Sequence, residues 1–377
     1  KKSMPIYAVV DVGGSAIKAA VFEVPAGGGS DTASGLPRIR GKFIWELPLS
    51  CPPVRLVKKI RENVLGMVGK TEPMPQRIMI ALGPEVGEYS LQNWTAIATG
   101  TPLTAPYIHE EYDRLFREHT DTRRAMIVSP IETLINDYPW VEGGQSSGWR
   151  SSAARAYPDE IRFRVLVLYL SLENGALFND LRNNFSGIPV SFVPLVIAEH
   201  DAVAQRMALR DAFLIDVGAE TTALVSIRDG KMAHAAFMPC GTRRMAEIAV
   251  KKSGCSMREA RLMMRGYAEG NRGGAVRDIA SAAAMDAAAE WKIHFIRALD
   301  GFYSAGPLSS TVLLVGGGAR FPEIRAAVSE RDWIGKFSYV EAPSVRVLEG
   351  AAFFGGNTLG GHLQGPEDTG LAALISY

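Results

Sequence analysis

Two segments of the chain, far apart in sequence, follow one pattern, and this repetition limits the possible folds more than any other feature. They read AVVDVGGSAIKAAVF around Asp11 and FLIDVGAETTALVSI around Asp216. Each has an apolar strand ending in Asp, a turn with Gly and a hydroxyl residue, and a second apolar strand. The chain of 377 residues is also longer than one hydrophobic core usually serves. We therefore expect two lobes built on one plan.

Strand and helix patterns alternate along the whole chain, which predicts an α/β protein whose sheets are covered on both faces. The expected strands include 7–10, 17–24, 39–47, 77–81, 125–128, 133–136, 161–170, 188–194, 212–216, 221–227, 231–238 and 311–315. The expected helices are 54–68, 107–118, 172–185, 198–209, 242–253, 256–265, 275–303 and 322–329. Segments 25–37 and 143–157 are rich in Gly, Ser and other small residues and are predicted to be loops.

The composition excludes several classes of protein. Lys plus Arg total 41 and Asp plus Glu total 40, so the net charge of +1 gives no electrostatic basis for binding nucleic acid or an anionic membrane. The three cysteines form no CxxC pair, which argues against a disulfide framework or a zinc site. No apolar run reaches the ~18 residues that a membrane-spanning helix needs.

The first glycine-rich turn, Asp11 to Ser15, has the chemistry of a phosphate site. Small residues let backbone N–H groups approach phosphate oxygens, and Ser15 adds a hydroxyl. Asp11 stands where it can hold Mg²⁺ through water, because hard cations prefer carboxylate and water ligands. Lys18 can neutralise phosphate charge. A plain tight hairpin is an equally good explanation of this segment alone.

The second turn repeats this chemistry. Asp216 is predicted to face the metal from the other lobe, and Gly218, Thr221 and Thr222 to contact the outer phosphates. A plain hairpin again explains the segment equally well.

The third segment, Val312 to Pro322, is an apolar strand followed by Gly316, Gly317 and Gly318 and then a helix. Glycines before a helix N-terminus permit the close approach of a flat base or a phosphate. The segment is neither GxGxxG nor a GxxxxGK[ST] P-loop, so it does not indicate a dinucleotide fold.

Taken in order, the three segments resemble the phosphate-1, phosphate-2 and adenosine motifs of the actin and sugar-kinase superfamily. The resemblance implies a two-lobed actin-like (ribonuclease H-like) ATPase fold with ATP and Mg²⁺ between the lobes. It places Asp11, Gly13, Gly14, Ser15, Lys18, Asp216, Gly218, Thr221, Thr222, Gly316, Gly317 and Gly318 at the nucleotide.

The stretch from Val193 to Gly266 is similar to the matching stretch of FtsA, the actin homologue of the bacterial division ring, and also to PilM of type IV pilus assembly. Both carry an inserted subdomain, 1C, and here MIVSPIETLINDYPW is similar to its closing segment. The resemblance implies lobe I at 1–81, a 1C-like insertion at 82–158, and a return to lobe I at 159–195. Lobe II follows at 196–240, a helical 2B-like part at 241–302 and the adenosine motif at 303–345. A return to lobe I and the C-terminal tail are expected at 346–377.

Several residues depart from the FtsA pattern. The second hairpin has Ala219 and Ala223 where DIGGGTTD is usual, and the helix flanking adenosine has Arg261 and Met263 in place of Glu and Lys. Glu259 is the candidate replacement for that Glu by a small register shift. For hydrolysis, Glu199 or Asp201 is the candidate residue to orient water, although a solvated helix start is the simpler explanation. ATP binding is therefore expected, with weak hydrolysis at most.

The leading functional hypothesis is an FtsA-type protein that polymerises, or acts as a scaffold, at the cytoplasmic face of the membrane in bacterial cell division. Its partners would be copies of itself, division-ring or membrane-protein peptides, and the membrane through a tether or partner; no nucleic acid is expected. One alternative is a PilM-like scaffold of pilus assembly. The other is a small-molecule kinase of the same fold, although no NDxxA or GxD block is present.

Overall fold

The computed structural model divides into two compact units, and each is described by itself. The first unit comprises 1–85 and 181–377, and the second comprises 86–180. The described residues are 4–25, 36–48, 52–98, 104–120, 123–136, 138–139, 160–183, 185, 187–271, 273–305, 307–339 and 341–377. The loop predictions for 26–35 and 143–157 lie outside them.

The first sheet of the first unit has five strands in the order β3-β2-β1-β4-β9. Strands β1, β2 and β3 form an antiparallel meander, whereas β4 and β9 run parallel to β1. Helix α1 connects β3 to β4 and buries Leu56, Ile60 and Val64 on one face. The elements are β1 (Ile6–Val12), β2 (Ala16–Glu23), β3 (Arg38–Glu46), α1 (Pro53–Val68), β4 (Arg77–Leu82) and β9 (Val190–Pro194).

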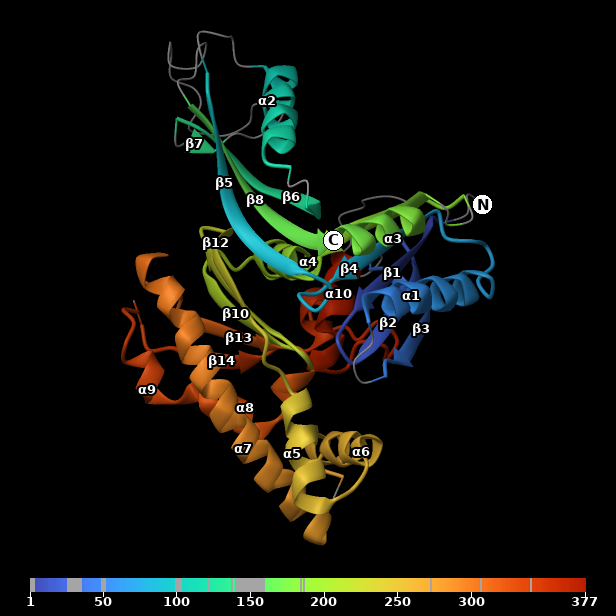
Figure 1. The fold of residues 1–377 in the computed structure, drawn as a ribbon, viewed down its shortest axis with the longest axis vertical. Coiled ribbons are helices and arrows are strands. Elements are labelled where there is room, and N and C mark those ends of the chain that lie inside the picture. Colours follow the sequence, from blue (N-terminus) through green and yellow to red (C-terminus); the bar gives the residue numbers. More distant parts are fainter. Residues whose placement is uncertain are drawn as a thin grey trace. The chain divides into compact units, whose positions relative to one another are not determined.

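The second sheet repeats this arrangement with the order β12-β11-β10-β13-β14 (Figure 1). Again three strands form an antiparallel meander and two run parallel to its first strand. The strands are β10 (Ala212–Val217), β11 (Thr222–Arg228), β12 (Lys231–Met238), β13 (Thr311–Val315) and β14 (Ser344–Val347). The two similar sequence segments thus occupy equivalent hairpins, β1–β2 and β10–β11.

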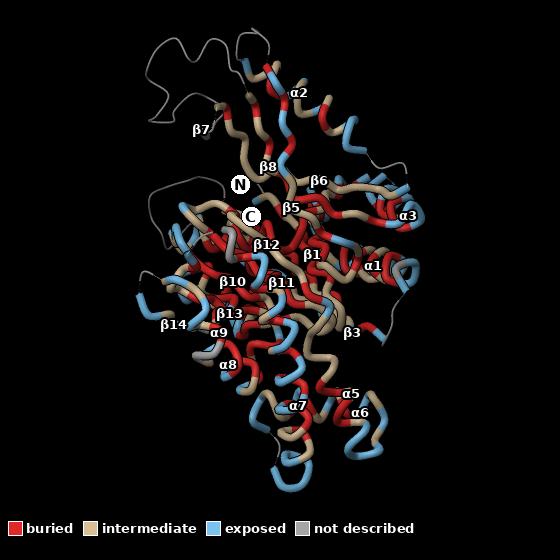
Figure 2. Tube along the Cα trace, turned by 60° about the vertical axis from the view of Figure 1, so that its left-hand side comes forward, coloured by how far each residue is buried: buried red, intermediate tan, exposed pale blue. Residues whose placement is uncertain are grey.

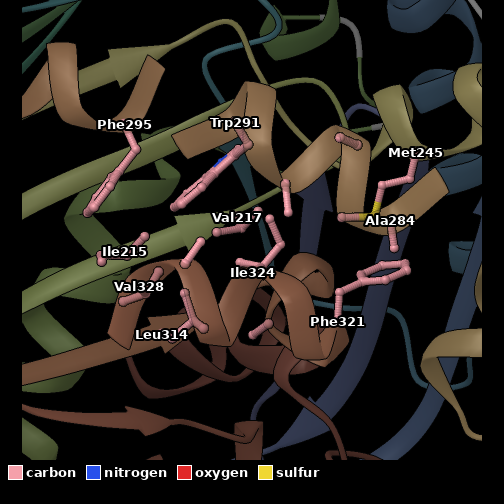
Figure 3. Close-up of a cluster of buried hydrophobic side chains, with 14 of the residues drawn as sticks. Ile215, Val217, Met245, Ala284, Trp291, Phe295, Leu314, Phe321, Ile324 and Val328 are labelled. Atoms are coloured by element: carbon pink, nitrogen blue, oxygen red, sulfur yellow. The ribbon is translucent and has the colours of Figure 1, made fainter. Parts of the chain in front are cut away.

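Helices α7 and α8 pack against the second sheet and form the core shown in Figure 3. Ile215 and Val217 from β10 and Leu314 from β13 meet Trp291 and Phe295, and all are at most 1% exposed. Helix α7 begins as an alanine-rich run, which favours helix and permits close packing. The helices of this lobe are α5 (Arg243–Ser253), α6 (Met257–Ala268), α7 (Gly274–Leu299), α8 (Pro322–Ser329) and α9 (Arg331–Ile334).

The C-terminal part returns to the first sheet. The 3₁₀ turns η5 (Gly350–Phe354) and η6 (Pro366–Asp368) lead into helix α10 (Thr369–Ser376), which is buried from Thr369 to Ile375. The apolar stretch near the end of the sequence is therefore part of the core. No helix among the described residues is long and apolar enough to span a membrane.

The second unit is a four-stranded antiparallel sheet in the order β5-β8-β6-β7, with α2 packed on one face. Trp94 and Phe163 from the sheet meet Ile108 and Leu115 from the helix, and Tyr112 lies between both aromatic rings. The elements are β5 (Glu88–Ile97), α2 (Ala105–Glu118), β6 (Arg124–Ile135), β7 (Tyr138–Pro139) and β8 (Glu160–Ser171). Helix α3 (Leu172–Asn183) follows β8.

Most predicted elements are present, but several differ, and strands β7 and β14 and helices α9 and α10 were not predicted. Strand β5 was missed because polar Ser90, Gln92 and Asn93 interrupt its apolar residues. The two strands predicted near 125 and 133 form the single strand β6, whose register shifts at Pro130. The helix predicted over 198–209 begins earlier, as α4 (Leu195–Asp201), and continues as the π-helix η2 (Ala202–Arg206). In Figure 2 the strands β1, β10 and β13 are mostly buried, as their apolar sequences predict.

Candidate functional site

The candidate site is a cleft in the first unit where the turns of the two equivalent hairpins meet. Both turns close with the same bond: Gly13 N–H donates to Ala16 C=O at 3.0 Å, and Gly218 N–H donates to Thr221 C=O at 2.9 Å. A Cβ added at Gly14 would overlap the Glu220 side chain. Glycine at this position therefore lets the two turns approach one another.

The inner part of the cleft is a cavity of about 150 Å³. Both hairpins contribute to its lining, together with the ends of β4, β9 and β13. Its lining includes eleven of the predicted site residues: Asp11, Gly13, Gly14, Ser15, Lys18, Glu199, Asp216, Gly218, Thr221, Gly316 and Gly317. Residues far apart in the sequence thus converge on one small space.

Carboxyl groups crowd this cavity. Burial and the nearby Asp11 charge raise the pKa of Asp216 to about 6. Burial, with repulsion from Asp11 and Asp216, also raises the pKa of Glu199 well above its usual value. Burial and the same charges raise the pKa of Glu85 to about 8. A cation bound in this cavity would offset the burial and repulsion that raise the pKa values of these groups.

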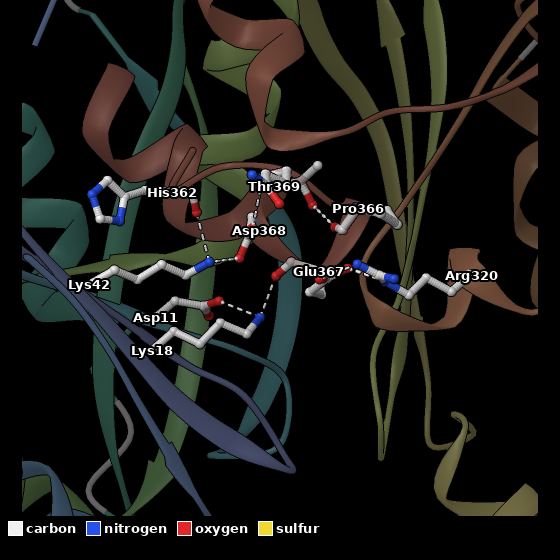
Figure 4. A network of polar contacts seen from close by, with 10 residues as sticks. Asp11, Lys18, Lys42, Arg320, His362, Pro366, Glu367, Asp368 and Thr369 are labelled. Carbon is white, nitrogen blue, oxygen red and sulfur yellow. Dashed lines mark hydrogen bonds and ion pairs between the residues drawn. The ribbon is translucent and has the colours of Figure 1, made fainter. Parts of the chain in front are cut away.

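Lys18 is the cation that the first hairpin supplies. It lies across the hairpin from Asp11, and its Nζ is 3.3 Å from Asp11 Oδ2 (Figure 4). Lys18 also donates to the Glu367 carbonyl of the C-terminal segment. The residue across from Asp216 in the second hairpin is Ala223, which has no charge. The two lobes are therefore equivalent in backbone but not in charge.

The glycines of the third segment differ in what they do. Gly316 and Gly318 allow close packing against β10, whereas Gly317 leaves open space in the cleft. Gly316 has φ +81°, and a Cβ there would overlap Asp216 Oδ1. A Cβ at Gly318 would overlap Val217. These two glycines let the segment pack against β10, and Gly318 does not line the described cavities. Gly317 lines both cavities and has open space beside it, with Glu367 Cβ 3.9 Å from a built Cβ.

An outer cavity of about 400 Å³ shares residues with the inner one, including Ser15, Lys18 and Gly317. Its apolar lining comes from Ile44, Ala246, Met264, Ala268 and Phe321. Its charged lining comes from Glu46, Glu220, Arg243, Arg261, Arg265, Glu269, Arg320 and Glu367. An apolar pocket with charged groups at its margin suits a flat base attached to a polar sugar.

Four predicted site residues are not brought to the cleft. Thr222 is fully buried, donates to Cys240 C=O at 2.7 Å and accepts from Trp291 Nε1–H at 3.0 Å. Because successive strand residues face opposite sides, Thr221 faces the cleft and Thr222 the core. Glu259 is exposed and accepts from Ser256 N–H at 2.8 Å in a capping box. Glu259 lines neither the inner nor the outer cavity.

Asp201 and Gly318 are the other two predicted site residues that do not line the inner cavity. Gly318 packs against Val217, as described above. Asp201 Oδ1 lies 2.8 Å from Nδ1 of the neighbouring His200 and does not line the inner cavity. By contrast, Glu199 is 1% exposed and lines that cavity, and its Oε2 has no hydrogen-bond partner among the residues that the structure describes. The expectation of a solvated helix start is wrong for Glu199, because α4 is buried on all sides there.

The sequence prediction missed Glu85 and the C-terminal residue Glu367. Glu85 follows β4, which is parallel to β1, so it arrives at the same sheet edge as Asp11. Thr221 Oγ1 lies 3.5 Å from Glu85 Oε2. The Gly-Pro-Glu at the end of a buried strand was a usable signal for Glu85. Glu367 is positioned by tertiary packing alone, through its ion pair with Arg320 at 2.5 Å.

The cleft fits a nucleotide with a water-coordinated divalent cation. Asp11 and Asp216 approach the inner cavity from opposite lobes, and the orphaned Glu199 Oε2 points to a missing polar partner. Among the described residues, no three His, Cys, Asp or Glu side chains are close enough together to hold a metal directly. Carboxylates acting through water, as Mg²⁺ prefers, agree with this spacing.

Comparison with known proteins gives the fold and no closer relationship. No protein-family model and no curated protein sequence matches the chain. Among solved structures, the chain is similar to one described as "PilM-PilN type IV pilus biogenesis complex". It has 16% identity, a TM-score of 0.65 and full coverage of both chains. It is also similar to the ethanolamine utilization protein EutJ from Carboxydothermus hydrogenoformans. That match has 12% identity and a TM-score of 0.50, and covers 100% of this chain and 90% of that one.

At these identities the likeness concerns the backbone. Two five-stranded sheets of one topology, hairpin turns that meet in a cleft, and similarity over the whole chain agree with the expected fold class. The chain has a two-lobed actin-like ATPase fold.

Proposed function

We propose that the cleft of the first unit binds ATP with Mg²⁺. The observation that carries this proposal is the convergence of both hairpin turns and Lys18 on one inner cavity that adjoins an apolar outer cavity. The turns offer backbone N–H groups to the phosphates, and Lys18 offsets phosphate charge. Asp11 and Asp216 hold Mg²⁺ through water, and the outer cavity takes the adenosine beside Gly317.

Hydrolysis by this site is proposed to be weak. Glu199 is the buried carboxyl in the inner cavity that can contact water beside the terminal phosphate. Burial, with repulsion from Asp216 and Asp11, raises its pKa and so disfavours the carboxylate form that would accept a proton from water. The chain's own residues therefore hold a nucleotide better than they activate water.

A pair of lysines tests the binding site. Lys18 and Lys42 lie on neighbouring strands and both bind the C-terminal segment, Lys42 through Asp368 Oδ1 at 2.5 Å and His362 C=O at 2.8 Å. Lys18 lines both cavities, whereas Lys42 lines neither. Calorimetric titration with ATP and Mg²⁺ should show binding that Lys18→Met weakens at least tenfold and Lys42→Met leaves within about twofold. Equal losses in both variants would contradict the assignment of the phosphate site.

The role of the nucleotide is proposed to be control of assembly, as in a scaffold or filament subunit. The full-length likeness to the PilM–PilN structure supports a scaffold that holds a partner peptide, for which the inserted unit 86–180 is the proposed 1C-type binding module. The FtsA-type role in division rests on the sequence segments around the second hairpin. The domain boundaries 82–158 and 241–302 belong to this proposal as well.

Electron microscopy of the protein with ATP and Mg²⁺ on a lipid monolayer tests these roles. Ordered filaments support the FtsA-type role. Without filaments, co-sedimentation with a partner's cytoplasmic peptide supports the PilM-type role. Phosphorylation of an added sugar, with neither assembly, would replace both by the kinase alternative.

A further inference from the structure

Two arginines of α6 line the outer cavity and bond to the opposite lobe. Arg261 donates from Nη1 to Leu47 C=O at 3.0 Å and from Nη2 to Ser15 C=O at 3.2 Å. One turn further along the helix, Arg265 Nη2 lies 2.6 Å from Glu46 Oε1. All three acceptors belong to the first lobe, whereas α6 belongs to the second. The helix is thereby tied to the opposite wall of the cleft.

The anchor point of Arg261 is the phosphate-type turn itself. The Ser15 carbonyl also accepts from Leu47 N–H at 2.8 Å, so the turn, the end of β3 and α6 share one acceptor. Ser15 and Arg261 both line the outer cavity. With these bonds formed the cavity still has a volume of about 400 Å³. The bridge therefore joins two walls of the cavity without filling it.

The two arginines do not contribute equally. Arg265 and Glu46 are more than half exposed, at 55% and 57%, and exposed ion pairs add little because water and salt screen them. Arg261 is partly buried and gives a charged donor to two carbonyls, a stronger arrangement. Arg261 is the residue that holds the bridge.

We propose that Arg261 is a clamp that controls how fast the nucleotide enters and leaves the cleft. This rests on the proposed nucleotide site. The bridge joins only residues of this chain and leaves a cavity of about 400 Å³ beside it, so it can form whether or not a nucleotide occupies the cavity. An interaction present in both the free and the bound state, and broken only while the cleft opens, slows entry and exit and leaves the dissociation constant nearly constant. A residue that contacted the ligand itself would instead change the dissociation constant.

Stopped-flow fluorescence with mant-ATP and Mg²⁺ measures both rates in the full chain. Arg261→Met keeps most of the apolar stem and should raise the association and dissociation rates together by about tenfold or more, with the dissociation constant changing less than about threefold. Arg258→Met is the matched control from the same helix. Arg258 is exposed and lines neither cavity, and this control should stay within about twofold.

Two results would overturn the clamp. One is unchanged rates in Arg261→Met; the other is a faster dissociation with a proportional rise in the dissociation constant, which indicates direct ligand contact. If Arg261→Met does not fold, Arg261→Lys is the second variant. It keeps the positive charge but loses the paired N–H donors of the guanidinium group, and it should accelerate both rates to a smaller extent. Absence of mant-ATP binding by the unmodified protein would refute the proposed function instead, so the two failures are distinguishable.

Discussion

The substitution Glu85→Gln should remove much of the pH dependence of stability at neutral pH. Glu85 lines the inner cavity, where burial and repulsion from Asp11, Asp216 and Glu220 raise its pKa from 4.5 to about 8. Between these two values the native protein holds a proton that the unfolded chain has released. Raising the pH through this window therefore favours unfolding.

The size of the effect follows from that difference in proton binding. Within this window, each rise of one pH unit lowers the free energy of unfolding by about 1.4 kcal/mol. From pH 6 to pH 8 the Glu85 carboxyl passes from fully to half protonated in the native protein, so it alone lowers the free energy of unfolding by about 2 kcal/mol. The amide of Gln does not titrate, and the variant should lack this loss.

Urea unfolding followed by tryptophan fluorescence in EDTA, at pH 6, 7 and 8, measures the difference between the two proteins. Glu62→Gln is the control, since Glu62 is 62% exposed on α1 and pairs with Lys58. Its pH profile should match that of the unmodified protein. Parallel profiles for Glu85→Gln and the unmodified protein would show that Glu85 titrates in its ordinary range, and the proposed electrostatics of the inner cavity would be wrong.

Three further predictions concern the core and the cleft. In the same urea assay, Gly316→Ala should destabilise the protein by more than about 2 kcal/mol, because Gly316 has a positive φ and an added Cβ would overlap Asp216. Gly270→Ala is the control: Gly270 also has a positive φ but lies beside open space, so the substitution should cost only about 1 kcal/mol. Trp291→Phe should cost about 1–3 kcal/mol because Thr222 loses a buried donor; a Thr222→Val cycle with no coupling energy would contradict this. Arg320→Ala should cost about 1 kcal/mol or less, since both it and Glu367 are one-third exposed, and a loss that does not shrink in high salt would show that packing dominates.

The repeated segments show how far sequence reasoning reaches. Apolar strands ending in Asp and followed by Gly turns predicted both hairpins, and the structure gives them the same register and the same closing bond. Strand and hairpin patterns are local, so they are readable from the residues themselves. Strand β5 was not predicted because the polar residues Ser90, Gln92 and Asn93 interrupt its alternation of apolar and polar residues.

Side-chain direction was the main source of error in the site. Thr221 and Thr222 are neighbours in sequence, yet one lines the cleft and the other is buried against Trp291. Glu259 was chosen for its distance from a motif, whereas its carboxylate caps α6. A shift of one residue reverses the face that a side chain presents, and composition does not reveal this.

The sequence alone determined the two equivalent hairpins, the glycine segment after β13 and thus the fold. Tertiary structure alone decided which groups meet in the cleft. Glu85 arrives there through the parallel pairing of β4 with β1, and Glu367 through the return of the C-terminal segment to Lys18 and Arg320. Arg261 reaches Ser15 across the cleft. These contacts join residues separated by long stretches of chain, and only the packed structure sets such distances.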